Sequence, residues 1–497
     1  MHSEPMTGPS ARRAHRLALA GTATLLGCTA LGLAPTVAQA DPSTAAPGPR
    51  AKPFDLDGDG HGELAVGEPW SRGGGKVSIL RGTSTGVTAS GSKEITQATP
   101  GVAGADEDRD HWGRAVTSGD FDRDGRADLV VGALQENWVD DDPAQGAVTI
   151  IRGGPGGAPG HGSRVVVASN DDDIWGGGLA VGDLDGDGYD DLVVSGGYPD
   201  DPSERDGSVF SAPFLGVNVL YGSPTGLQTS RLVRLTSANG TPDRVHHGGQ
   251  FGEAIAVGDA TGDGMDDLAV SYGDDTGSGV YIYRGRTGQI LTRADQVVEG
   301  LGRIALSLGD FDGDGFADLA GNSATERAKV YVYRGTASGL DAANRRVLDD
   351  PTGDPVNQSE YGRALAAGDL DADGRDDLAV GAFSGRGGAV FVYDGTSTGV
   401  SNAQRHQWSQ QSPGVPGTSE TGDQCGIDVR IADVGRSAVP DLVATCNGEN
   451  SSAGAVIVIY GHADRGLTGT GAQVWLKSTP GVVGVPGPDQ GWGKLGQ

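Results

Sequence analysis

The sequence is poor in several features that identify common protein classes. Only 3 of its 497 residues are cysteine, and 5% are aromatic. Lysine and arginine total 37 against 66 aspartate and glutamate residues, so the formal net charge is -29. A chain this acidic lacks the basic surface that phosphate binding requires, which excludes nucleic acid as an expected partner.

Signatures of the common catalytic sites are also missing. The sequence contains no G-x-S-x-G, no H-E-x-x-H, no P-loop and no Arg-Gly-Asp tripeptide. His246 and His247 are adjacent, and His111 precedes a motif described below, but adjacent histidines in a connecting segment are more often incidental than catalytic. We name no catalytic residue, and the sequence favours a protein that is not an enzyme.

Long apolar runs are confined to the first 40 residues. Three arginines precede an apolar run over residues 17–33, and Ala38-Gln39-Ala40 follows it. This order is typical of a secretory signal peptide, so residues 1–40 are expected to be removed and the mature chain to begin at Asp41. A membrane anchor is the alternative, but the run is short and interrupted, and no later segment is long enough to span a bilayer.

The three cysteines divide between this leader and the rest of the chain. Residues 25–28 (LLGC) resemble a lipobox, so a lipoprotein anchored through Cys28 is a minor alternative to secretion. Removal of the leader leaves Cys425 and Cys446. An even pair in an exported protein favours a disulfide, with two buried free thiols as the alternative.

Glycine and acidic stretches are what the sequence has in abundance. Its 87 glycines suit many short strands and tight turns. In residues 54–64 (FDLDGDGHGEL) carboxylates alternate with glycine and other residues, and similar stretches recur. Their first residues are Asp55, Asp120, Asp183, Asp259, Asp310 and Asp369, with a degenerate copy at Asp433. Self-similarity at intervals of 51 to 76 residues indicates a repeat architecture.

The same segments flank each acidic stretch. Eight residues before the first aspartate, four repeats have an aromatic-glycine pair, namely Trp112-Gly113, Trp175-Gly176, Phe251-Gly252 and Tyr361-Gly362. Two others have Gly302-Arg303 and Cys425-Gly426 at that place. A Leu-x-Val segment follows the stretch, and then a segment such as VYVYRG (residues 330–335). Their alternation and β-branched content predict strands.

Four strands in each of seven units predict an all-β protein, a seven-bladed β-propeller over residues 41–497. A β-solenoid is the alternative, but units of about 63 residues are too long for one rung. The first unit lacks its aromatic-glycine strand, whereas Trp492-Gly493 carries that signature. We therefore expect residues from about 488 to 497 to join blade one and close the ring. A degenerate blade seven is expected over residues 425–461.

These units resemble FG-GAP repeats, the blades of the integrin α-subunit propeller, in a secreted bacterial type. The aromatic-glycine pairs correspond to FG, Gly132-Ala133 and Gly381-Ala382 correspond to GAP, and residues 67–69 (GEP) are a variant. The resemblance covers nearly the whole mature chain. It has no counterpart to the integrin legs, membrane helix or inserted I-domain.

The acidic stretches predict calcium sites, because carboxylate and carbonyl oxygens suit Ca²⁺, which takes about 6–8 oxygen ligands. An EF-hand is excluded, because that loop needs a glutamate at position 12, where this chain has valine or glycine. The resemblance implies side-chain ligands at positions 1, 3, 5 and 9 and a backbone carbonyl at position 7.

Five stretches carry the complete ligand set, and a sixth carries a weaker one. The implied ligands are Asp55, Asp57, Asp59, His61 and Glu63 in residues 55–63; Asp120, Asp122, Asp124, Arg126 and Asp128 in 120–128; Asp183, Asp185, Asp187, Tyr189 and Asp191 in 183–191; Asp310, Asp312, Asp314, Phe316 and Asp318 in 310–318; and Asp369, Asp371, Asp373, Arg375 and Asp377 in 369–377. The weaker stretch, residues 259–267, has Asp259, Thr261, Asp263, Met265 and Asp267. Only Asp433 and Asp441 remain in blade seven, so no metal is expected there, and the two cysteines would brace that blade instead.

The resemblance implies calcium loops on one rim and ligand binding on the opposite face. Candidate ligand-face residues are Trp70, Trp138, Tyr198 and Phe383. The expected function is that of a secreted, monomeric, calcium-binding adhesion module for an extracellular protein or cell-surface ligand. A lectin-like propeller that binds glycans is the first alternative, and a polysaccharide lyase or hydrolase on the same fold is the second.

Overall fold

Short β-strands are the main regular elements of the structure, which is a computed structural model. It describes residues 49–108, 110–134, 146–157, 162–167, 176–196, 216–236, 239, 250–274, 277–289, 291–353, 360–383, 387–463, 465–483 and 494–495. The predicted signal peptide, Cys28, Trp138, Tyr198, Trp175, the two adjacent histidines and Trp492-Gly493 lie outside the described residues.

The strands form seven antiparallel sheets, each paired in chain order. Blade one has β1 (Leu64–Glu68), β2 (Lys76–Arg81) and β3 (Thr88–Ile95); blade two has β4 (Trp112–Gly119), β5 (Asp128–Ala133), β6 (Ala147–Ile151) and β7 (Ser163–Val167); blade three has β8 (Gly178–Gly182), β9 (Asp191–Ser195), β10 (Val217–Tyr221) and β11 (Gln228–Leu235). Blade four has β12 (Gln250–Gly258), β13 (Asp267–Asp274), β14 (Gly277–Tyr283) and β15 (Gln296–Glu299); blade five has β16 (Leu301–Gly309), β17 (Asp318–Ser323), β18 (Lys329–Tyr333) and β19 (Arg345–Asp349). Blade six has β20 (Tyr361–Gly368), β21 (Asp377–Ala382), β22 (Ala389–Tyr393) and β23 (Arg405–Trp408); blade seven has β24 (Cys425–Ala432), β25 (Asp441–Cys446), the short helix α1 (Glu449–Ser452), β26 (Ala455–Tyr460) and β27 (Thr468–Leu476).

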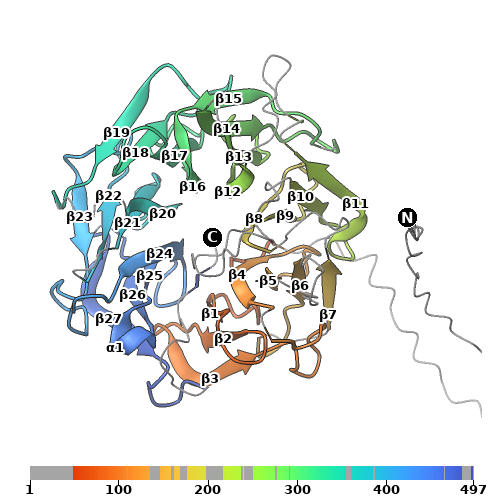
Figure 1. Cartoon of the computed structure of the whole chain (residues 1–497), viewed down its shortest axis with the longest axis vertical. Helices are drawn as coiled ribbons and strands as arrows, with labels where there is room; N and C mark the ends of the chain where they lie inside the picture. The colour runs from red at the N-terminus through yellow and green to blue at the C-terminus, as the bar shows by residue number, and fades with distance from the viewer. Residues whose placement is uncertain are drawn as a thin grey trace, which may run out of the picture. The chain divides into compact units, whose positions relative to one another are not determined.

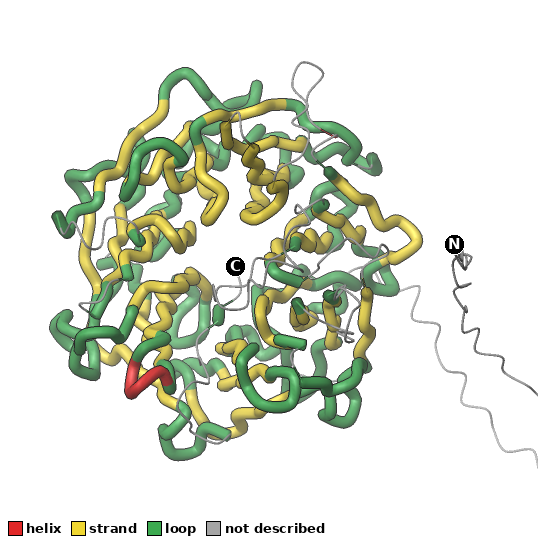
Figure 2. Tube along the Cα trace, viewed as in Figure 1, coloured by secondary structure: helices red, strands yellow, loops and turns green. Residues whose placement is uncertain are grey.

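The seven sheets stand around a central axis, with β4, β8, β12, β16, β20 and β24 nearest to it and the last strand of each blade at the outer edge (Figure 1). Figure 2 shows the same ring of strands with loops connecting them around its rim. Layers of buried apolar side chains fill the space between neighbouring blades, as where Val330 of blade five packs with Tyr361 and Phe391 of blade six. The predicted seven-bladed β-propeller is confirmed.

The aromatic-glycine and Leu-x-Val-Gly signatures have one structural cause, which is close contact between adjacent blades. Trp112 is fully buried, and Gly113 after it has a φ of +92°, a conformation that favours glycine. The carbonyl oxygen of Gly113 lies so close to Gly67 of the preceding blade that a Cβ on Gly67 would overlap it. Gly132 meets Gly176 and Gly381 meets Gly426 in the same way. The FG glycine of one blade therefore packs on the GAP glycine of the blade before it.

The signature of blade five is shifted from the position that its sequence spacing predicts. Spacing placed Gly302-Arg303 there, but Leu301 is the residue that pairs with Ser323 across the sheet, as Trp112 pairs with Ala133 in blade two. Leu301 is fully buried. The bulge in β16 contains one residue more than the bulge in β12, so counting back from the acidic stretch gives the wrong residue.

The C-terminal segment closes the ring on blade one, as predicted. The amide of Gly67 in β1 donates to the carbonyl of Lys494 at 2.8 Å, and the amide of Lys494 donates back at 3.2 Å. Leu495, only 4% exposed, packs with Leu64 and Val66. A fourth chain segment therefore pairs with the three-stranded sheet of blade one.

A buried ion-pair network adds a second link between blades one and seven. Lys477, which follows β27, places its Nζ 2.6 Å from Glu68 Oε1 and 2.9 Å from Glu94 Oε2. Lys76 lies 3.0 Å from the same Glu94 carboxylate. Because each buried charge has opposite charges beside it, the network avoids the cost of an unpaired ion.

The predicted disulfide is present. Cys425 and Cys446 are bonded, and they are register partners on β24 and β25. The bond thus joins the first two strands of blade seven. In the described part of the chain, no helix has the length and apolar character that crossing a membrane requires.

Candidate metal centres

The six acidic stretches form loops at one end of the propeller, each leading into the second strand of its blade. Glycine permits the tight curvature: Gly58 and Gly60 in the first loop have φ values of +76° and +89°. Side chains at alternate positions then turn toward the interior of the loop.

The first aspartate of each loop organises the backbone around it. In the first loop, the amide of Gly60 donates to Asp55 Oδ2 at 3.0 Å. The equivalent bonds are Gly125 to Asp120 (3.2 Å), Gly188 to Asp183 (2.8 Å), Gly264 to Asp259 (2.7 Å), Gly315 to Asp310 (2.9 Å) and Gly374 to Asp369 (2.9 Å). The same loop conformation is therefore built six times, including the loop that has Thr261 at position three.

Three carboxylates converge in each of the five complete loops. Each group offers oxygens that all lie within 4.8 Å of one another. The groups are Asp55, Asp57 and Glu63; Asp120, Asp122 and Asp124; Asp183, Asp185 and Asp191; Asp310, Asp312 and Asp314; and Asp369, Asp371 and Asp373. These acidic clusters are compatible with Ca²⁺ sites.

The hydrogen bonds within the loops test whether the residues fit a cation. Asp55 Oδ1, Glu63 Oε1 and Asp185 Oδ1 are buried oxygens without a hydrogen-bond donor. Buried carboxylate oxygens without a partner are costly, and a hard cation is the partner that such a group of oxygens accepts. The residues present therefore fit Ca²⁺.

Burial dominates the electrostatics of the carboxylates at position nine. Desolvation is the largest cause in every case, and it raises the pKa to about 8 for Glu63 and Asp191 and to about 7 for Asp128, Asp267, Asp318 and Asp377. Neighbouring loop carboxylates raise these pKa values further. A cation in the loop would act in the opposite direction, because it stabilises the charged form.

Arginines beside the loops are site residues that the sequence analysis missed. Arg81 Nη2 lies 2.9 Å from Asp59, Arg152 Nη1 lies 3.2 Å from Asp122, and Arg334 Nε lies 2.6 Å from Asp312. The signal was visible as an Arg-Gly pair after the third strand of these blades. The arginines offset part of the negative charge of the carboxylates at positions three and five.

Adjacent loops are also bonded to each other. The amide of Asp310 donates to Asp376 Oδ2 at 2.9 Å, and the amide of Asp376 donates to the carbonyl of Asp310 at 2.9 Å. The pairs Asp120 with Asp190 and Asp183 with Asp266 repeat this clasp. In these pairs, the residue at position eight of one loop is therefore hydrogen-bonded to the residue at position one of the preceding loop. Ordering one loop thus restricts the conformation of its neighbour.

The degenerate seventh loop uses its two aspartates for protein contacts. Asp441 accepts from the amides of Gly461 at 2.9 Å and Val434 at 3.1 Å. Asp433 Oδ2 lies 2.8 Å from Lys52 Nζ. These contacts are consistent with the prediction that this loop binds no metal, and that prediction remains untested.

Two candidate ligand-face aromatics lie in the described residues. Trp70 follows β1 and is partly buried, with its ring edge-on to His111 at a centroid distance of 4.4 Å. Phe383 follows β21 and is partly buried, with the guanidinium of Arg363 at 5.7 Å from its ring. Both follow the strand that begins at an acidic loop, so these connections lie at the end of the propeller opposite the acidic loops.

Comparisons with known proteins agree with this architecture. The FG-GAP repeat family matches residues 112–151 and 175–210, and the FG-GAP-like repeat family matches residues 55–131 and 310–380. Integrin alpha-5 of Xenopus laevis is 29% identical over 302 residues, which cover 58% of this chain and 21% of that protein. Integrin alpha pat-2 of Caenorhabditis briggsae is 28% identical over 240 residues, covering 46% and 14%.

An enzyme also contains a similar segment. Phosphatidylinositol-glycan-specific phospholipase D of Rattus norvegicus is 31% identical over 147 residues, covering 28% of this chain and 17% of that protein. The chain thus spans about a fifth or less of the length of these relatives. Among solved structures, the Vibrio cholerae biofilm matrix protein Bap1 matches with 14% identity and a TM-score of 0.25 over 87% of this chain and 77% of that one, which carries no structural argument.

Proposed function

Because the chain is an integrin-like β-propeller built of FG-GAP repeats, we propose that it is a secreted, calcium-stabilised adhesion module that binds an extracellular protein or cell-surface ligand. The observation that carries the proposal is that the two ends of the propeller present different kinds of side chain. At one end the acidic loops carry converging carboxylates, and hydrogen bonds join neighbouring loops across blades. At the other end partly buried aromatic side chains stand on loops.

The carboxylates at positions one, three, five and nine would hold the calcium, together with the carbonyl at position seven. Bound Ca²⁺ would offset the mutual repulsion of these carboxylates and fix the loop between the first two strands. The chain's own residues then carry that order between blades, because three pairs of adjacent loops are clasped together. Calcium in this proposal supports the structure and takes no part in a reaction.

Thermal unfolding with and without calcium tests the metal part of the proposal. Millimolar calcium is expected to raise the Tm and EDTA to lower it. Asp312→Asn, which alters a converging carboxylate, should reduce the calcium-dependent shift, whereas Asp108→Asn, an exposed aspartate outside the loops, should not. A Tm that does not respond to calcium would contradict the calcium assignment.

Binding to arrays of extracellular proteins and glycans, in calcium, tests the ligand part. A protein ligand that loses affinity on Trp70→Ala or Phe383→Ala supports the adhesion module, because aromatic anchors contribute much of the affinity at such surfaces. The partly exposed indole of Trp70 also favours the lectin-like alternative, since an aromatic face can stack on a sugar ring. Selective glycan binding that is lost with Trp70→Ala would favour that alternative and justify a search for cleavage products.

A further inference from the structure

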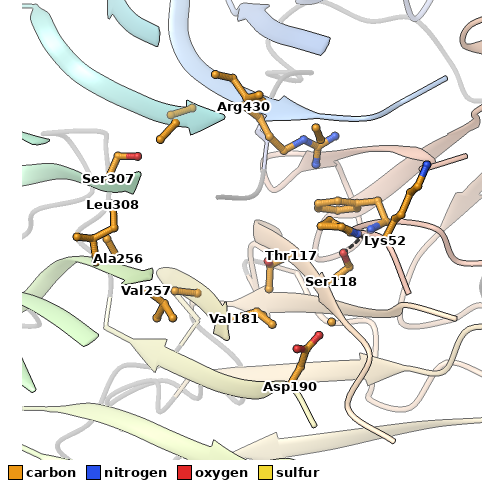
Figure 3. Close-up of a pocket in the computed structure, with 18 of the residues that line it drawn as sticks. Lys52, Thr117, Ser118, Val181, Asp190, Ala256, Val257, Ser307, Leu308 and Arg430 are labelled. Carbon is orange, nitrogen blue, oxygen red and sulfur yellow. Dashed lines mark hydrogen bonds between the residues drawn. The ribbon is translucent and has the colours of Figure 1, made fainter. Parts of the chain in front are cut away.

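A cavity of about 560 Å³ lies at the centre of the ring, on the side of the acidic loops. The innermost strands of blades two to seven and residues 50–54 line it (Figure 3). A cavity of this size matches the pockets that hold small molecules, which are typically about 300–1,000 Å³. The proposed adhesion function leaves this space unused.

Most of the wall is apolar. Val181, Val257, Leu308 and Ile431 come from four different blades and face the same space. Thr117 and Ser118 at the end of β4 add hydroxyl groups. Such a wall favours an occupant with an apolar body.

One strongly charged group stands in this apolar wall. Arg430 on β24 is buried, with 4% of its surface exposed, and none of its three guanidinium nitrogens has a hydrogen bond to a residue that the structure describes. Figure 3 shows Arg430 and Asp190 on opposite sides of the space. Burial lowers the pKa of Arg430 to about 10, so the side chain is still charged at neutral pH. A buried guanidinium without acceptors is costly, because each donor has lost its water without a replacement.

The guanidinium lies against an aromatic ring. Its Cζ lies 4.0 Å from the centre of the Phe54 ring. Phe54 has a φ of +61°, an unusual conformation for a bulky residue, and its amide donates to Ser118 Oγ at 2.6 Å. The chain therefore accepts an unusual backbone conformation at the residue whose ring lies against Arg430. Stacking leaves the N–H edge of the guanidinium for an acceptor.

The other charges on the cavity wall already have partners. Arg50 pairs with Asp190, and Lys52 lies 2.8 Å from Asp433. Asp120 accepts the amide of Ala51 at 3.0 Å. Asp428, on the same strand as Arg430, accepts the amide of Leu495 at 3.0 Å and adds attraction that raises the pKa of Arg430 without a hydrogen bond to it. Cationic side chains outnumber carboxylates among the lining residues, in a chain whose formal net charge is -29.

We propose that this central cavity binds a small molecule with one carboxylate on an apolar body, and that the carboxylate sits on the guanidinium of Arg430. A planar carboxylate matches the paired N–H groups of arginine, which bind it with two parallel hydrogen bonds. The apolar wall would cover the rest of the molecule. This site is separate from the aromatic loops of the proposed adhesion face.

Calorimetric titration of the calcium-loaded protein with octanoate, 1-octanol and inorganic phosphate tests the proposal. Octanoate is expected to bind, with 1-octanol and phosphate at least about tenfold weaker, because each lacks one of the two recognised features. Arg430→Met should weaken octanoate binding at least about tenfold and leave 1-octanol unchanged. Arg346→Met, an exposed arginine on the outer strand β19, is the matched control and should leave octanoate binding unchanged.

The comparison of ligands on the unaltered protein decides the question even if Arg430→Met does not fold. No octanoate binding, or equal binding of octanoate and 1-octanol, would overturn the assignment. Equal binding of phosphate and octanoate would show a general anion site. It would overturn the proposal that the cavity recognises an apolar body. Octanoate binding that survives Arg430→Met would place the carboxylate elsewhere and likewise reject the proposal.

Discussion

The glycine that ends the third strand of each blade shows how one residue supports an acidic loop. The amide of Gly335 donates to Asp318 Oδ1 at 2.8 Å, so it holds the carboxylate at position nine in place. A Cβ on Gly335 would lie 2.5 Å from the carbonyl oxygen of Ala317, and the backbone there cannot move independently of the loop. Gly153, Gly285 and Gly395 occupy the same place in other blades and make the same bond.

Gly335→Ala is therefore expected to destabilise the protein by about 1–3 kcal/mol, as overpacking of a tight site does. It should also weaken calcium binding, because the methyl group displaces the backbone that positions Asp318. Chemical denaturation in calcium and in EDTA measures both effects. Gly216→Ala is the control, because its new methyl group would meet the flexible side chain of Arg234 at 3.0 Å. Equal stability of the two variants would show that the close approach is unimportant.

The raised pKa values at position nine predict how pH acts on the loops. Burial raises the pKa of Asp191 to about 8 and that of Asp318 to about 7, above the usual value for an aspartate. Without calcium, the raised pKa of each of these carboxyl groups adds to the free energy of unfolding. That contribution is fully present below the ordinary pKa of an aspartate, and it is lost as the pH rises through the raised pKa values of about 7 to 8.

Calcium-free protein should therefore have a lower Tm at pH 8.5 than at pH 6. Calcium binding needs the charged form of the carboxylate. The affinity of each loop for calcium should therefore rise by about tenfold between pH 6 and pH 8. Calorimetric titration with calcium at several pH values, at constant ionic strength, measures this dependence. An affinity that stays constant over this range would mean that the buried carboxylates are already ionised before calcium binds.

At the scale of the blade, a disulfide replaces two features that other blades have. Blade seven has Cys425 where blade two has the buried Trp112, and its acidic loop keeps only Asp433 and Asp441. The bond from Cys425 to Cys446 ties β24 to β25 directly. The covalent link therefore restrains the pair of strands that the loop restrains in other blades.

Replacing both cysteines by serine should lower the free energy of unfolding by about 2–4 kcal/mol, since the bond closes a loop of 21 residues. The loss should be the same in calcium and in EDTA, because the bond and the metal loops belong to different blades. Denaturation of the oxidised, reduced and Cys425→Ser/Cys446→Ser proteins measures it. A loss that disappears in EDTA would show that the disulfide acts through the calcium loops instead.

At the scale of the whole molecule, stability depends on closing a ring whose first and last blades are far apart in the sequence. The pairing of Gly67 with Lys494 and the ion pairs of Lys477 with Glu68 and Glu94 join these ends. Leu495 adds a buried apolar contact. An open ring would leave the edge of β1 unpaired, and unpaired edges favour aggregation.

Leu495→Asp should therefore lower the free energy of unfolding by several kcal/mol, roughly 3–5, because it buries a charge in an apolar contact. It should also increase aggregation on heating. Thermal unfolding with light scattering measures both effects. Val483→Asp is the matched control, since Val483 is 47% exposed, and it should change neither. If the two variants behave alike, the C-terminal contact does not hold the ring.

The amino-acid sequence was enough to predict the period of the repeat, the strands, the number of blades and the six acidic loops. These follow from local patterns, because alternation, glycine position and carboxylate spacing act within a few residues. Counting residues back from the acidic loop gave the wrong position for Leu301. The bulge in that strand has one extra residue, which shifts the strand register and leaves no mark in the local sequence pattern. The arginines beside the loops were visible only as Arg-Gly pairs, whose role depends on the strand ending next to the loop.

Contacts that depend on the closed ring could be identified only from the folded chain. The clasp from Asp310 to Asp376 joins two blades, and the ion pair of Lys477 with Glu94 joins residues that are 383 apart in the sequence. Arg430 gave no signal in the sequence, because a single arginine in a strand of mixed polarity normally faces water. It is buried without hydrogen bonds because six inner strands and residues 50–54 converge around one axis, and no local pattern encodes that convergence.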